Sequence, residues 1–136
     1  MVFDANEATQ AYIDGLGEEA LAQAAAYTSG SHWIMLWGLV VAILVTLLVV
    51  RSGLLSRITS GLEGSNFFIR GFCISAAFVV LSGIIELPWS IYSGWWREMS
   101  YVRTSQPIAD FLGQSGLGLA LNAVFMGLFF TAVYAL

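Results

Sequence analysis

The chain has 136 residues, of which 58% are hydrophobic and only 10% are charged, and its mean hydropathy is +0.79. A soluble domain carries about 25% charged residues, so this composition excludes an ordinary soluble protein and indicates an integral membrane protein. The formal net charge of -4 and the lack of a basic cluster argue against a nucleic-acid partner. A single cysteine, Cys73, excludes an intramolecular disulfide.

The first 31 residues are predicted to form a helical segment outside the bilayer. They contain no Lys or Arg, so they lack the charge pattern of a secretory signal peptide. Asp4 followed by Glu7 has the form of a capping box, and apolar residues then share one face of an amphipathic helix. Two glycines within 15–17 interrupt this helix, and the polar residues 28–31 are expected to break the chain before the first span.

Residues 32–136 are predicted to form a transmembrane domain of three helices, which makes the fold class an all-α membrane protein. The first uncharged stretch has a length near the lower limit of about 17–25 residues for crossing the hydrocarbon core. The spans are expected at about 33–50, 67–87 and 117–136, with a polar loop over 88–116.

The distribution of arginines predicts the orientation in the membrane. Three arginines lie in or next to the short loop 51–66, whereas two in the longer loop are balanced by three acidic residues, and the N-terminal segment has none. Because cytoplasmic loops carry an excess of positive charge, we expect the N-terminus outside and the C-terminus in the cytoplasm.

Small residues recur at helical spacing in the second and third spans. Such ladders let helices approach closely, which is how apolar helices associate when lipid gives no hydrophobic drive. The ladders can join the three helices to one another or to a partner subunit, and the hypothesis adopted is that a partner binds the ladder at 123, 127, 131 and 135 together with the aromatic surface over 86–98. The packing residues are Gly71, Ser75, Ala123, Gly127, Thr131 and Ala135.

Two polar residues at membrane depth are candidates for a role beyond packing. Asn122 is expected to be buried and to form an interhelical hydrogen bond, an interpretation favoured over a ligand site. Glu86 is either functional or an acid at the membrane boundary that snorkels or pairs with an arginine, and the sequence leaves both open. With a single histidine and no His-Glu-x-x-His motif, no catalytic, cofactor-binding or metal-ligating residue is predicted.

Aromatic and charged residues are concentrated over 86–98. By composition, the aromatic side chains form a belt at the level of the lipid headgroups, next to a proline that kinks the helix. The adjacent arginine and glutamate that close the segment are expected to point in different directions and to form no mutual ion pair. The residues singled out are Glu86, Pro88, Trp89, Tyr92, Trp95, Trp96, Arg97 and Glu98.

This segment resembles the N-terminal transmembrane region of the integral-membrane CAAX prenyl proteases, a family of zinc metalloendopeptidases. Its bacterial members have the form Leu/Phe-Pro-x-x-x-Tyr-x-x-Phe-Phe-Arg-Glu, and the matching residues here are Leu87, Pro88, Tyr92, Arg97 and Glu98. Weaker likeness runs from residue 7 to residue 119 and so covers nearly the whole chain. The resemblance implies a multi-pass protein of the bacterial inner membrane and, in the family, zinc proteolysis inside an intramembrane chamber.

The chain also departs from the family pattern. Members usually continue with Tyr-Gly-(Leu/Phe)-(Ser/Asn)-Asn, whereas this chain continues Tyr101-Val102-Arg103 and so lacks the glycine turn. An Asp and a Lys that are frequent near the next helix appear here as Gln114 and Leu117. The catalytic half, with its His-Glu-x-x-His helix and downstream glutamate ligand, is absent from this chain.

The sequence therefore predicts a non-catalytic membrane protein, derived from the protease module, that acts as a structural or accessory subunit of a larger complex. The loss of polar residues over 102–117 favours this interpretation. The alternative is a truncated form or the N-terminal part of an active zinc endopeptidase, which the apolar end of the chain favours. A small transporter or channel is disfavoured because the spans carry almost no polar lining. The expected partners are the lipid bilayer and other transmembrane subunits.

Overall fold

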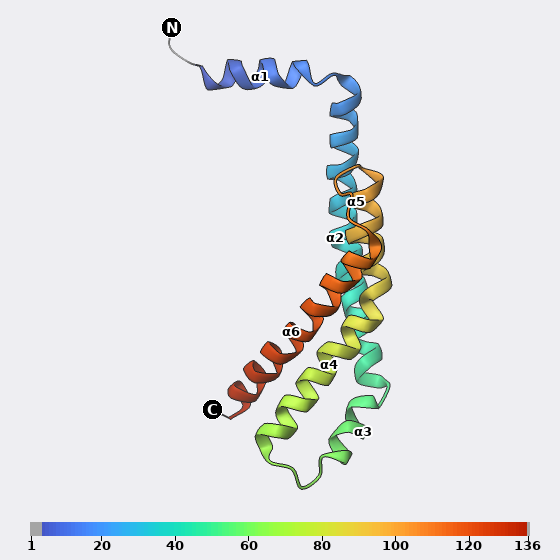
Figure 1. Ribbon diagram of the computed structural model, residues 1–136, viewed down its shortest axis with the longest axis vertical. Helices are drawn as coiled ribbons and strands as arrows, with labels where there is room; N and C mark the ends of the chain where they lie inside the picture. The colour runs from blue at the N-terminus through green and yellow to red at the C-terminus, as the bar shows by residue number, and fades with distance from the viewer. Residues whose placement is uncertain (1–3, 136) are drawn as a thin grey trace. The chain divides into compact units, whose positions relative to one another are not determined.

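The computed structural model describes residues 4–135, and over these residues it contains helices and no strand. The predicted all-α class is therefore confirmed. In chain order the elements are α1 (Ala5–Gly15), α2 (Glu18–Arg51), α3 (Leu54–Gly61), α4 (Phe67–Ser90), the π-helix η1 (Ile91–Trp96), α5 (Arg97–Ser100) and α6 (Ile108–Tyr134), as Figure 1 shows.

Three helical stretches are long and apolar enough to cross a membrane, as predicted: Glu18–Arg51, the continuous run Phe67–Ser100, and Ile108–Tyr134. The first two have 34 residues each. At 1.5 Å per residue such a helix is about 51 Å long, which exceeds the hydrocarbon core of about 30 Å. Part of each helix must therefore extend beyond the apolar region of the bilayer.

The chain divides into two compact units, Met1–Trp37 and Gly38–Leu136. In the first unit, α1 begins where the capping pattern predicted. The Asp4 carboxylate accepts hydrogen bonds from the backbone N–H groups of Asn6 at 2.9 Å and of Glu7 at 3.4 Å. Between α1 and α2 the backbone turns at Gly17, whose φ of +80° suits a residue without a Cβ atom.

The predicted break at residues 28–31 is wrong, because α2 runs through them without interruption. The hydroxyl of Thr28 donates to the Ala24 carbonyl and that of Ser31 to the Tyr27 carbonyl, each at 2.9 Å. Both hydroxyl groups therefore find their hydrogen-bond acceptors within the same helix. Serine and threonine that bond back one turn in this way do not act as caps for a new helix.

In the second unit, α4 and α6 form the closest helix pair, and they run antiparallel (Figure 1). Small residues allow the approach. A Cβ atom added at Gly71 would lie 3.3 Å from the hydroxyl of Thr131, and one added at Gly127 would lie 2.8 Å from the ring of Phe72. Further along, a Cβ atom at Gly83 would overlap the end of the Leu119 side chain. A larger residue at any of these three positions would therefore require the facing side chain to move.

The ladder of the third span lies in this α4–α6 interface. Ala123, Gly127 and Thr131 are buried, whereas Ala135 follows the end of α6 and is exposed. On α4, Gly71 and Ser75 are half-buried. The structure thus places most of the small residues between two helices of the same chain.

The loop expected over 88–116 is much shorter in the structure. Helix α4 continues through η1 and α5 to Ser100, and α6 already begins at Ile108. Only residues 101–107 lie outside helices in this stretch. Hydropathy marks where a helix leaves the apolar part of the membrane, and it does not mark where the backbone stops being helical.

The remaining helices of this unit pack more lightly. At Gly38, a Cβ atom on α2 would lie 3.6 Å from the indole nitrogen of Trp89. Val45 and Val49, about two and three turns further along α2, are buried. Helix α3 follows Gly53, whose φ is +72°, and packs against α4.

We expect Gly127→Leu to destabilise the α4–α6 pair. Its side chain would collide with Phe72, and overpacking of this kind costs about 1–3 kcal/mol. The melting temperature of the detergent-solubilised chain, followed by circular dichroism at 222 nm, should fall. Gly118→Leu is the matched control, because Gly118 is exposed on the same helix with no atom within 4 Å of an added Cβ. An equal loss of stability in both variants would contradict this packing.

Candidate functional site

The segment singled out in the sequence, 86–98, forms the end of the long α4–η1–α5 helix. Pro88 lies inside α4, where proline removes one backbone hydrogen bond and crowds the preceding turn. Three residues later the helix widens into the π-helix η1, which spans Ile91–Trp96. π-helical turns are rare in proteins, and those that do occur often lie at functional sites.

The aromatic side chains of this segment separate into two groups. Trp89, Tyr92 and Trp96 follow one another along the helix, with ring centroids 5.8 Å apart for the first pair and 5.5 Å for the stacked second pair. Tyr92 and Trp96 are about half exposed, at 48% and 55%. These three residues form an aromatic stripe that faces outward at Tyr92 and Trp96, which suits the membrane–water interface, whereas the half-buried Trp89 lies next to Gly38 on α2.

Trp95 instead holds the loop that follows α5. Its indole N–H donates a hydrogen bond of 2.8 Å to the carbonyl of Gln106. The same residue, Gln106, donates its backbone N–H to the hydroxyl of Thr104 at 3.1 Å. The Trp95 side chain thus holds residues 101–107 against the helix. The sequence interpretation placed all aromatic residues of this segment in one interfacial belt and did not predict this role.

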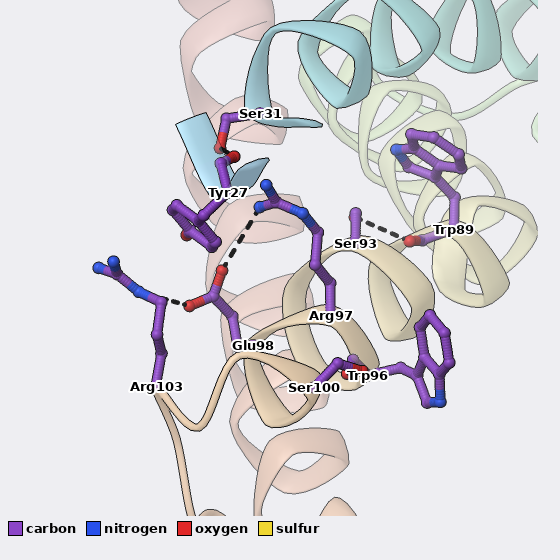
Figure 2. A network of polar contacts seen from close by, with 9 residues as sticks. All are labelled: Tyr27, Ser31, Trp89, Ser93, Trp96, Arg97, Glu98, Ser100 and Arg103. Atoms are coloured by element: carbon purple, nitrogen blue, oxygen red, sulfur yellow. Dashed lines mark hydrogen bonds and ion pairs between the residues drawn. The ribbon is translucent and has the colours of Figure 1, made fainter. Parts of the chain in front are cut away.

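Three charged side chains meet at the end of α5. The carboxylate of Glu98 lies between two guanidinium groups, 3.2 Å from Nε of Arg103 and 3.8 Å from Nη1 of Arg97 (Figure 2). The expectation that Arg97 and Glu98 form no ion pair is therefore wrong. Adjacent residues do diverge at Cβ on a helix, but these two side chains are long enough for their ends to converge at the outer limit of pairing distance.

Arg97 is unusual because it is a buried cation, with a side chain only 10% exposed. Its guanidinium carbon also lies 5.5 Å from the ring centroid of Tyr101, within the range of a cation–π contact. Burying an arginine is costly unless opposite charge and aromatic faces replace its water. The Arg-Glu pair of the motif therefore fixes the helix end as part of a small polar cluster.

Val102 is the residue that sequence reasoning undervalued. It is exposed, and its φ of +55° places it in the left-handed region, which is costly for a β-branched side chain. Around it, the N–H of Val102 bonds to the Met99 carbonyl and that of Arg103 to the Glu98 carbonyl. Glycine is the preferred residue at this position of a helix end. The absence of the glycine that the family pattern has after Tyr101 is the sequence feature that could have indicated this strain.

The two polar residues predicted at membrane depth have different surroundings. Glu86 is half-buried on α4 and forms no ion pair with any of residues 4–135, so the arginine-paired interpretation is not seen within the chain. Asn122 is exposed among residues 4–135, so the predicted interhelical hydrogen bond is not formed within the described part of the chain. It lies about 100° around α6 from the buried Ala123, which is the rotation between adjacent residues of an α-helix, and so outside the contact with α4.

The cluster consists of ion pairs and a cation–π contact. Over residues 4–135, no group of three or more His, Cys, Asp or Glu residues lies close enough together to hold a metal ion. What the segment 86–103 provides is an aromatic stripe facing outward and an ion cluster that closes the helix.

We expect Val102→Gly to stabilise the chain. Glycine relieves the left-handed strain, which is worth about 1–2 kcal/mol, although its extra freedom in the unfolded state offsets part of the gain. The melting temperature in detergent should rise. Val102→Ala removes the β-branching but keeps a Cβ atom at positive φ, so a smaller change is expected. A lower melting temperature for Val102→Gly would contradict the strained helix end.

The family described as the CAAX prenyl protease N-terminal, five membrane helices, matches residues 4–136. Three helices in the described part of this chain have the length and composition to cross a membrane. No curated protein and no solved structure matches the chain. Because the match covers almost every residue, the chain belongs to the family of CAAX prenyl protease N-terminal membrane domains.

Proposed function

We propose that this chain is a non-catalytic membrane subunit of protease-module ancestry that packs against another transmembrane helix of a larger complex. The observation that carries the proposal is Asn122. It lies 14 residues after the start and 12 before the end of α6, so it is in the middle of an apolar helix. Among residues 4–135 its exposed amide has no hydrogen-bond partner.

An amide at this depth calls for a partner. Leaving a primary amide in hydrocarbon without hydrogen bonds costs several kcal/mol, and neither water nor lipid tails satisfy it there. A side chain or carbonyl on a neighbouring helix does so, and hydrogen bonds of this type join transmembrane helices.

The surface around Asn122 suits a close neighbour. Gly118 lies one turn earlier on the same side of α6, with no atom within 4 Å of an added Cβ. Gln114, one further turn away, is also exposed. We define Gln114, Gly118 and Asn122 as the outer face of α6. The ladder at 123, 127 and 131 is occupied by α4, so the partner in this proposal contacts the outer face and not the ladder.

The proposed topology follows the arginines. Arg51, Arg57 and Arg70 are exposed near the α2–α3–α4 turns, which supports a cytoplasmic location for that end of the second unit. In a bacterial inner membrane, the N-terminus would then lie on the outer side.

The alternative function is the N-terminal part of an active membrane zinc endopeptidase. The family match and the Arg97–Glu98 pair support it. Reading the coding sequence beyond Leu136 separates the two. An in-frame His-Glu-x-x-His motif would support the protease, and a stop codon directly after Leu136 would support the subunit.

We expect Asn122→Leu to release the partner while the chain itself stays folded. The substitution removes the amide at similar volume, and the amide has no partner within the chain to lose. The measurement is co-purification of the tagged chain from native membranes in mild detergent, followed by intact mass of the complex.

Thr131→Val is the matched control for this experiment. It is also a polar-to-apolar change of similar volume on α6, but Thr131 faces α4 and its hydroxyl bonds to the Gly127 carbonyl. This variant should keep the partner. Retention of the partner by Asn122→Leu, or release by Thr131→Val alone, would overturn the proposed interface.

A further inference from the structure

A groove lies at the beginning of α4, beside the α4–α6 interface. Its volume is about 450 Å³, and it is lined by Ser65, Phe67, Arg70, Gly71 and Ile74. Its walls are mainly apolar, and one cationic side chain contributes to its lining. A second groove, of about 440 Å³, is lined by residues of both α4 and α6 and contains no charged group.

Arg70 has no anionic partner in the described part of the chain. It is exposed, and it forms no ion pair with any of residues 4–135. It is the fourth residue of α4, in the first turn, where the helix dipole disfavours a positive charge and favours an anion. An anion bound here would therefore interact favourably with both the guanidinium group and the helix end.

The surrounding charge is also positive. Arg51 at the end of α2 and Arg57 on α3 are both exposed, and neither is paired with a described acidic residue. Glu63, in the turn before α4, is the one acidic residue within 51–70. These residues give this end of the unit a net positive charge, which attracts anionic headgroups at a membrane surface.

The position relative to the membrane narrows the choice of ligand. Phe67 begins the second membrane-spanning helix, so Arg70 lies one turn inside its apolar stretch. At this depth a long arginine side chain extends toward the headgroup region while its stem contacts apolar groups. A guanidinium group binds a phosphate through two parallel hydrogen bonds, and the apolar walls suit a hydrocarbon chain.

We propose that this groove binds one anionic phospholipid, with its phosphate on Arg70 and one acyl chain along Phe67 and Ile74. A soluble anion would gain nothing from the apolar walls, and a zwitterionic lipid would gain less from the unpaired charge. This site is independent of the outer face of α6 and of the proposed partner.

The test uses the full chain purified in a neutral detergent, with phosphatidylglycerol as probe and phosphatidylcholine as reference. Bound lipid is counted by native mass spectrometry over a titration. One phosphatidylglycerol should bind more tightly than phosphatidylcholine. Arg70→Gln should weaken the binding of phosphatidylglycerol by about tenfold or more, since it removes the charge-assisted hydrogen bonds to the phosphate.

Arg57→Gln is the matched control, because it removes the same charge from an exposed residue that does not line the groove. It should change the affinity less than Arg70→Gln does. Equal losses in the two variants would mean diffuse attraction and would overturn the site, as would equal binding of the two lipids.

Two further measurements test the acyl chain and the fold. Ile74→Trp fills the groove while keeping Arg70, and it should also weaken phosphatidylglycerol binding. Unchanged binding in this variant, or full displacement of the lipid by inorganic phosphate, would overturn the acyl-chain contact. Circular dichroism of each variant without lipid confirms that the helices remain folded.

Discussion

The close antiparallel contact of α4 with α6 is the interaction on which the second unit depends. Glycine at 71, 83 and 127 lets side chains of the facing helix reach the backbone. Inside a membrane there is no water to drive apolar helices together, so the fit of these surfaces must supply the attraction. Dispersion contacts weaken steeply with small gaps, which is why single atoms matter along this interface.

The small residues of α4 and α6 lie in that contact, so any contact with lipid or with another protein involves the remaining surface of the unit. The sides of α4 and α6 that turn away from each other carry large apolar groups with few polar exceptions. Each exception marks a place where lipid tails alone are an inadequate solvent. Asn122 is the basis of the proposed contact with another helix, and Arg70 is the basis of the proposed lipid site.

The sequence was informative where a single physical rule dominates. Apolar length predicted the three spans, the Asp4 cap predicted the start of α1, and the order of motif residues over 86–98 predicted the family. It failed where two rules compete. Thr28 and Ser31 are helix breakers in water-exposed segments, but in a long helix they bond back to carbonyls instead. The rotation of α6 depends on its packing against α4, so composition alone did not predict that Asn122 would be exposed.

The π-helix η1 has a consequence for the whole Arg-Glu end of the molecule. A turn with i to i+5 hydrogen bonds holds one residue more than an α-helical turn, so η1 is structurally equivalent to a one-residue insertion. Every side chain beyond Trp96 is thereby displaced by about 100° around the axis relative to an uninterrupted helix. A relative with one residue fewer between Pro88 and Arg97 would therefore keep the same Arg97 direction by having a regular helix there. Among relatives, chain length in this short segment and helix type are thus expected to vary together.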